Sequence, residues 1–158
     1  MDDDRRSAAT SGRVPVMSYR DLPLDMSQMP LSDPKTAADV VDLILDPGSR
    51  DAGSFALMIC SADDIGVKPV VIDAIPEDLP HQELAATLRS VLDLVAATEG
   101  SVVVARGRPG TFLLTDEDRA WHESMIAVCR AAGVRLLGAY VATSSTVRAL
   151  PAPLDKAS

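Results

Sequence analysis

Three arginines beside the start of a predicted helix are the residues whose types and spacing best suit chemistry. Arg106 and Arg108 flank a glycine at the end of an apolar run, and Arg119 follows within the helix. The amides and dipole of a helix N-terminus favour an anion, and a guanidinium can hold a carboxylate or phosphate with paired hydrogen bonds. We therefore treat these arginines as a candidate anion-binding site. The alternative is that the acids at 116–118 pair with the arginines and neutralise them.

Other reactive side chains are sparse. The chain has two histidines, His81 and His122, and two cysteines, Cys60 and Cys129, and neither pair has zinc-ligand spacing. A metal site at His122 beside a neighbouring acid is an alternative to an ordinary hydrogen-bonded histidine. A redox role for a cysteine would need an exposed thiol of low pKa, and the simpler interpretation is two small buried side chains.

Motifs for catalysis and cofactor binding are lacking. There is no Gly-x-Ser-x-Gly elbow, no Gly-x-x-x-x-Gly-Lys phosphate loop and no Gly-x-Gly-x-x-Gly fingerprint. We therefore predict no catalytic residue, no bound metal and no cofactor.

The periodicity of apolar residues predicts the elements that must position the arginines. Helical spacing recurs in three segments, and short apolar runs indicate five strands. The predicted elements are a helix at 35–45, a hairpin of strands at 55–60 and 69–75, a helix starting at 81, a strand at 101–105, a helix at 116–132, and strands at 134–143 and 146–150. Residues 48–53 are predicted to be a polar loop. This order predicts an α/β fold, a mixed sheet with terminal hairpins and flanking helices.

The domain organisation follows from composition. Residues 1–31 hold many of the prolines and methionines and show no regular period, so we expect a largely disordered N-terminal arm. Its apolar stretch at 17–29 suits either a strap over the domain or a segment that docks into a partner. Residues 32–150 are expected to form a single α/β domain, and residues 151–158 a C-terminal tail.

Two short motifs flank the loop that leads into the helix at 116–132. The first is Arg106-Gly-Arg108-Pro109 and the second is Thr115-Asp-Glu-Asp118. With the order of elements from 55 to 150, they resemble the JAB/MPN metalloprotease-like fold, a cytidine-deaminase-like layered architecture, and above all its RadC-type bacterial branch. Members of that family carry His-x-His-Pro and Ser-x-x-Asp at these places, with a loop one residue longer.

The resemblance implies a family member without its metal. The family chemistry needs two neutral imidazoles and a carboxylate on zinc, with an acid to activate the bound water. Arg106 and Arg108 are permanently charged and offer no lone pair, and residues 67–70, where the activating acid would lie, include none. The resemblance therefore implies a pseudoenzyme. Thr115 and Asp118 also have a structural explanation, as the two halves of a helix-capping box.

Charge excludes some partners. The net charge of −8 and only five aromatic residues disfavour nucleic-acid binding. No run approaches the eighteen apolar residues of a membrane span, and the N-terminus does not read as a signal peptide, so we expect a cytoplasmic protein.

Residues 36–100 carry twelve acids and three bases, whereas residues 101–158 carry seven bases and five acids. These two segments could face each other within one molecule or across a homodimer, but simple solvation of two surfaces explains the asymmetry equally well.

The function expected from the sequence is therefore binding. The leading hypothesis is a non-catalytic protein-interaction or regulatory domain, a JAB/MPN-like pseudoenzyme of bacterial composition that recognises a protein partner or itself. The alternative is a metal-independent binder of small anions, or an enzyme, that uses Arg106, Arg108 and Arg119. A third hypothesis is a redox-responsive regulator acting through Cys60 or Cys129.

Overall fold

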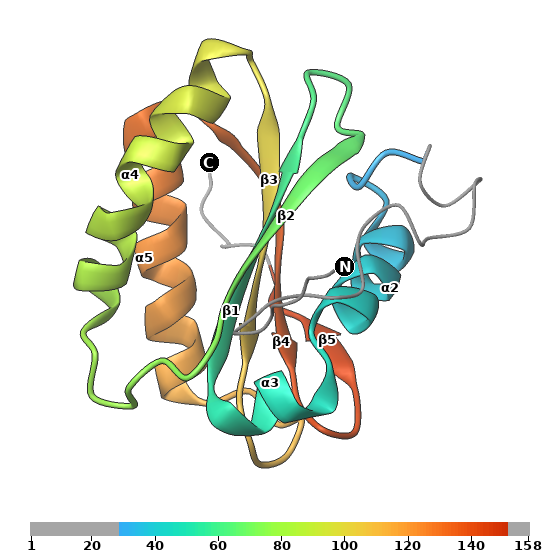
Figure 1. Ribbon diagram of the computed structural model, residues 1–158, viewed down its shortest axis with the longest axis vertical. Coiled ribbons are helices and arrows are strands. Elements are labelled where there is room, and N and C mark those ends of the chain that lie inside the picture. Colours follow the sequence, from blue (N-terminus) through green and yellow to red (C-terminus); the bar gives the residue numbers. More distant parts are fainter. Residues whose placement is uncertain (1–28, 152–158) are drawn as a thin grey trace, which may run out of the picture.

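The computed structural model describes residues 29–151 (Figure 1). The helices and strands of these residues carry the labels of Figure 1. They are α2 (Pro34–Ile44), α3 (Pro47–Ala52), β1 (Ser54–Cys60), β2 (Gly66–Ile72), α4 (His81–Ala97), β3 (Ser101–Gly107), α5 (Asp116–Ala132), β4 (Arg135–Ala142) and β5 (Val147–Ala149).

The five strands form one mixed sheet in the order β2-β1-β3-β4-β5. β1 pairs antiparallel with both β2 and β3, β3 pairs parallel with β4, and β4 pairs antiparallel with β5. Figure 1 shows α4 and α5 side by side on one face of this sheet, while α2 lies on the opposite face. The predicted α/β class, with a mixed sheet, terminal hairpins and flanking helices, is confirmed.

The two faces of the sheet bury two separate sets of apolar side chains, because successive residues of a strand point to opposite faces. In β1, Phe55 and Leu57 join the core under α4 and α5, whereas Ala56 and Met58 join the core under α2. The ring of Phe55 meets that of Trp121 on α5 edge-on, with centroids 6.4 Å apart. Each such buried side chain contributes roughly 1.5–3 kcal/mol relative to an exposed one. Trp121 is therefore part of the core, with 2% of its surface exposed.

Helix α5 begins and ends where its sequence predicts. The Thr115 hydroxyl accepts from the amide of Asp118, and the Asp118 carboxylate accepts from the amide of Thr115, which completes a capping box. At the other end Gly133 adopts a left-handed conformation with φ of 76°, which a residue without Cβ adopts without strain.

Two predicted boundaries are wrong. The segment expected as a polar loop at 48–53 is helix α3, which Pro47 starts in its first turn and which the Asp46 carboxylate caps by accepting from the amide of Ser49. Strand β2 spans Gly66–Ile72 and not the predicted 69–75, so Pro69 lies inside the strand. Proline is tolerated there because β2 is an edge strand and its outer side needs no donor.

The expected arm lies almost entirely outside the described residues, as does the expected tail. At the described start, Pro30 forms an isolated antiparallel bridge with Ile65, and Leu31 is buried in the core under α2. The packed domain therefore includes Leu31, which the expected boundary had placed in the arm. Among the described helices, none combines the length and the apolar character that crossing a membrane would take.

Candidate functional site

The site is built where β3 ends and α5 begins. Arg106 follows Val102 and Val104 at alternate positions of β3, so its side chain lies on the face that α4 and α5 cover. Gly107 belongs to the other face, where a Cβ would collide with Oγ of Ser54 on the neighbouring strand. At the end of β3, Arg106 therefore lies beside the N-terminus of α5, whereas Gly107 packs closely against β1.

Asp118 is the centre of this site. Its side chain is completely buried, with 0% exposure, in the first turn of α5. Its Oδ1 accepts from Nη1 of Arg106 and from Nε of Arg108, both at 2.9 Å. Its Oδ2 accepts from Nη2 of Arg108 at 2.7 Å and from the amide of Thr115 at 3.0 Å. A carboxylate removed from water is therefore compensated by two cations and a backbone donor.

The pKa of Asp118 is lowered by this arrangement. Burial by itself would raise the pKa, because it disfavours the charged form. The hydrogen bond from Arg108, the backbone hydrogen bond from Thr115 and the charges of Arg108 and Arg106 together outweigh burial. Asp118 is consequently ionised at neutral pH, and the cluster carries two positive charges against one negative charge.

Arg108 uses every one of its donors internally. Besides its two-pronged contact with Asp118, it donates to the carbonyls of Pro109, Thr111 and Leu113. The loop can wrap around the guanidinium because Gly110 adopts a φ of 98° that other residues rarely take. Arg108 therefore fastens the β3–α5 loop to α5, and it has no N–H left for a ligand.

Arg106 differs from Arg108 in this respect. Within residues 29–151, Nη1 of Arg106 donates to Asp118, and its other N–H groups have no hydrogen-bond partner. Its side chain lines a cavity of about 200 Å³ together with His81, at the start of α4. Nε2 of His81 lies 2.6 Å from a carboxylate oxygen of Glu117, but the direction of approach is not that of a hydrogen bond.

The structure brings together five of the six residues singled out in the sequence. Arg106, Arg108, Thr115 and Asp118 form one connected cluster, and Pro109 contributes a carbonyl to it. Arg119 does not join them, because its exposed side chain pairs with the fully exposed Asp116, at 3.1 Å. Internal pairing, the alternative interpretation of the arginines, thus describes Arg108 fully and Arg106 in part.

The cysteines and His122 are placed away from this cluster. Cys60 and Cys129 are free and buried, and burial raises their pKa values to about 12 and about 11. The redox hypothesis, which needs an exposed thiol of low pKa, is therefore disfavoured. Burial also lowers the pKa of His122, against a smaller raising effect of Glu123. Residues 29–151 contain no cluster of three metal-ligating side chains.

Two features of the site region escaped sequence reasoning. The loop that Arg108 holds exposes two adjacent apolar side chains, Phe112 at 48% and Leu113 at 62%. The apolar residues between Gly110 and the Thr115 cap were a sequence signal for this exposure. A loop has no regular period that would place its apolar side chains on a buried face. The second is Arg50, buried in α3, whose guanidinium donates to carbonyls beyond its own helix. An arginine in a short polar segment gives no signal of burial.

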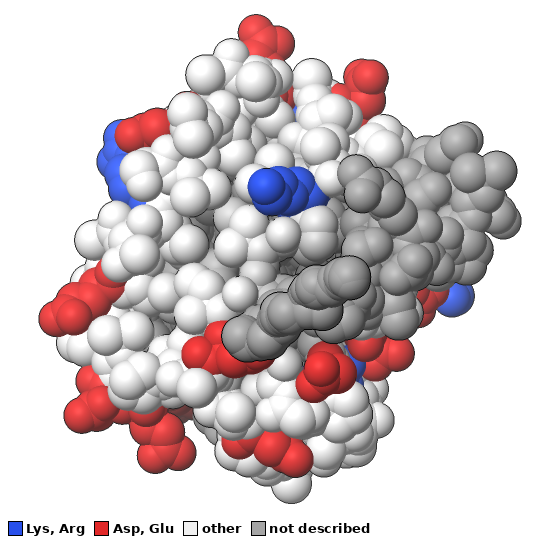
Figure 2. Space-filling model, in the orientation of Figure 1, with Lys and Arg blue, Asp and Glu red and all other residues white. Residues whose placement is uncertain are grey.

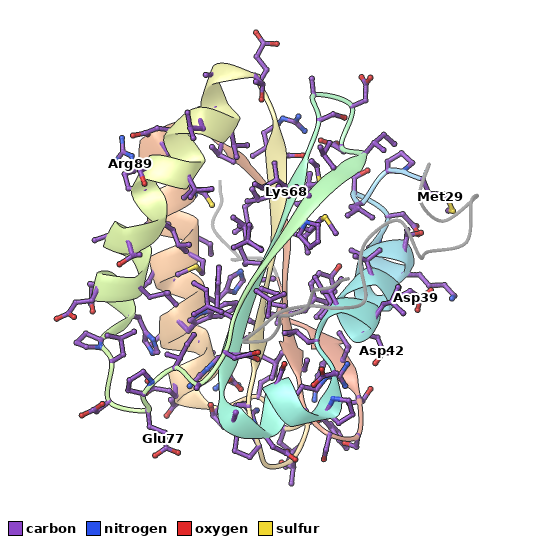
Figure 3. All side chains as sticks on the ribbon, in the orientation of Figure 1. Met29, Asp39, Asp42, Lys68, Glu77 and Arg89 are labelled. Atoms are coloured by element: carbon purple, nitrogen blue, oxygen red, sulfur yellow. The ribbon has the colours of Figure 1, made fainter. Side chains whose placement is uncertain are left out.

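The charges on one face of the described protein agree with the acidic composition. In Figure 2, acidic groups lie mainly around the rim of the face, and the basic group near its middle coincides with Lys68 in Figure 3. The described part of this face therefore has no basic patch of the kind that phosphate backbones need. Absence of nucleic-acid binding remains a prediction, because the view covers one side only.

Comparison of the chain with protein-family models, with curated proteins and with solved structures finds no match in any of the three.

Proposed function

We propose that this protein is a non-catalytic, JAB/MPN-like domain that acts by binding a protein partner or a second copy of itself. The observation that carries the proposal is the buried Asp118 carboxylate, which is held by Arg106 and Arg108 where the resembled family would hold a metal. The three side chains meet in space, as a ligand set of that family must. Two guanidiniums, however, supply the positive charge that zinc would supply.

The use of Arg108 supports a binding role. A histidine at this position would leave the loop carbonyls without a donor, whereas Arg108 binds three of them. The loop at 109–114 is thereby held in one conformation. A surface ordered in advance loses less entropy on association, so a fixed loop favours binding.

The exposed side chains of that loop support the proposed interaction surface, which comprises Phe112 and Leu113. Two adjacent exposed apolar side chains on an ordered loop offer a partner a preformed apolar contact. The guanidinium of Arg148 on β5 lies over the Phe112 ring at 5.9 Å from the centroid, which restricts the ring further. We infer that a partner packs on these two side chains beside Arg148.

A gain-of-metal experiment tests the family relationship. The double variant Arg106→His/Arg108→His would place two imidazoles beside Asp118. We expect this variant to bind one zinc ion, measured by competition with a chromophoric chelator, and the wild type to bind none at that site. Adding Asp118→Asn to the double variant is the matched control and should abolish binding. A double variant that keeps its circular-dichroism spectrum and binds no zinc would contradict the JAB/MPN proposal.

A second experiment tests the binding role separately. The full chain is used as bait, and its sedimentation is measured, with Phe112→Ser/Leu113→Ser as the test variant. Leu94→Ser is the control, since Leu94 is 72% exposed and lies near the C-terminal end of α4, not on the loop. We expect recovery of a partner, or formation of a dimer, by the wild type and the control but not by the loop variant. Association of the loop variant that equals association of the wild type would refute the proposed surface.

A further inference from the structure

The cavity beside Arg106 has the chemistry of a ligand site. It lies between the end of β3, the start of α4 and the first turns of α5, and its volume is about 200 Å³. One wall is the Arg106 guanidinium. The rest of the lining is mixed: five apolar residues (Phe55, Ile75, Leu79, Leu84 and Trp121) share it with the polar residues Ser54, Glu77, His81 and Arg108. Apolar walls combined with a few polar groups are usual for small-molecule sites.

The guanidinium in this cavity has unused donors. The side chain of Arg106 is 21% exposed, and within residues 29–151 its hydrogen bonding is limited to Nη1 with Asp118. Arg108, by contrast, has its five N–H groups engaged. The unpaired donors of Arg106 are not sealed from solvent and have no hydrogen-bond partner among the described residues. An acceptor that enters the cavity would supply one.

The electrostatics of the cavity favour an anion of single charge. Within the cluster, the two guanidiniums around the one carboxylate of Asp118 leave one positive charge in excess. The carboxylate of Glu117, beside His81 of the lining, is largely exposed to solvent. Helix α4 begins at the cavity with Pro80 as its N-cap, which offers no side-chain hydrogen bond to the first amides. Glu77 is at the cavity lining but is exposed, and Figure 3 shows its side chain directed away from the body of the protein.

We propose that this cavity binds a small aliphatic monocarboxylate, whose carboxylate pairs with Arg106 and whose hydrocarbon chain lies against Trp121 and its apolar neighbours. At about 30 Å³ for each water-sized group, the cavity has room for roughly six or seven non-hydrogen atoms. Butyrate is of this size. A phosphate dianion suits the site less well, because it carries more charge than the excess at Arg106 and leaves the apolar walls uncovered.

The proposal rests on the cavity and Arg106 and does not need the JAB/MPN relationship. Titration of the full chain with butyrate is followed through the fluorescence of Trp121, the one tryptophan of the chain and part of the cavity wall. We expect a saturable change with butyrate, a much smaller one with inorganic phosphate, and none with butyramide, which has the same shape without the charge. A response to butyrate no different from that to butyramide would overturn the proposal even if no variant could be prepared.

Two variants locate the ligand at Arg106. Arg106→Gln leaves Asp118 paired with Arg108, and we expect it to weaken butyrate binding by about tenfold or more through loss of a charge-assisted contact. Arg119→Gln is the matched control, because Arg119 is an exposed arginine of the same region outside the cavity, and it should bind as the wild type does. Equal affinity of the two variants would overturn the assignment. Failure here would leave the zinc and interaction experiments unaffected.

Discussion

Substitution of Asp118 by asparagine should destabilise the protein strongly although it changes few atoms. The carboxylate accepts four hydrogen bonds, two at each oxygen. An asparagine keeps one oxygen and has an NH2 group in place of the other. Two of the four N–H donors would therefore face another donor. Hydrogen bonds to charged groups contribute about 1.5–3 kcal/mol each, which gives a loss of about 3–6 kcal/mol. Removal of one partner from a buried ion pair typically costs about 3–5 kcal/mol, in agreement.

Urea unfolding at pH 7, followed by Trp121 fluorescence and circular dichroism, measures this loss. Asp116→Asn is the control, because Asp116 occupies the same helical turn but is fully exposed and, within residues 29–151, pairs with Arg119 alone, so we expect little change. A free energy of unfolding for Asp118→Asn within about 1 kcal/mol of the wild type would refute the reasoning. Such a result would mean that the two arginines are not held by this carboxylate in solution.

The pH dependence gives a second measure of the same contact. The folded pKa of Asp118 lies below its ordinary value of 3.8, so Asp118 contributes stability that is fully present above that pH. The contribution declines as pH falls below 3.8 toward the folded pKa, because in that range the carboxylate of the unfolded chain takes up a proton and the folded one does not. Asp118→Asn should therefore lose less stability on acidification than the wild type does. Parallel stability curves for the two proteins would contradict the lowered pKa.

Three further predictions concern buried groups outside the cluster. Arg50→Lys should cost roughly 2–4 kcal/mol in urea unfolding, because one ammonium cannot serve the carbonyls of Leu45, Asp42 and Thr143 that the guanidinium binds; a cost below about 1 kcal/mol would contradict this role. Ser54→Ala should be neutral or stabilising by up to about 1 kcal/mol, since Oγ of Ser54 is buried and has no partner among the described residues; clear destabilisation would reveal a missing partner. The two cysteines should resist iodoacetamide in the native protein and react after unfolding, because the raised pKa values keep the thiols protonated; rapid native labelling would contradict their burial.

Much of the fold could be predicted because its signals are local. The range of α5 follows from the Thr115 cap, an apolar stripe through Trp121 and the glycine after it, and the structure gives the predicted bounds. Strands β1 and β3 are short apolar runs, and both prove to be central strands. Helix α3 was missed because its six residues have no apolar period, and its start depends on Asp46 and Pro47 alone.

The candidate site was predictable only in part, for a different physical reason. Sequence spacing placed Arg106 and Arg108 near the acids of α5, but it could not decide which acid would be buried. The position of Asp118 in the capping box turns that side chain back toward β3, whereas Asp116 faces the solvent. The cavity could not be predicted at all, because its walls come from Phe55, Leu84 and other residues far apart in the chain.

The short sequence separation within the arginine–aspartate cluster has a consequence for how the chain folds. Arg106 and Arg108 lie only twelve and ten residues from Asp118, whereas strand β1 must find β3 across the whole of β2 and α4. Closing a short loop costs less chain entropy than closing a long one. The end of β3 and the start of α5 can therefore assemble before the sheet is complete. Strand β3 is then an ordered edge with which β1 can pair. If so, Asp118→Asn slows refolding in stopped-flow experiments, and an effect on the unfolding rate alone would place the cluster late in folding.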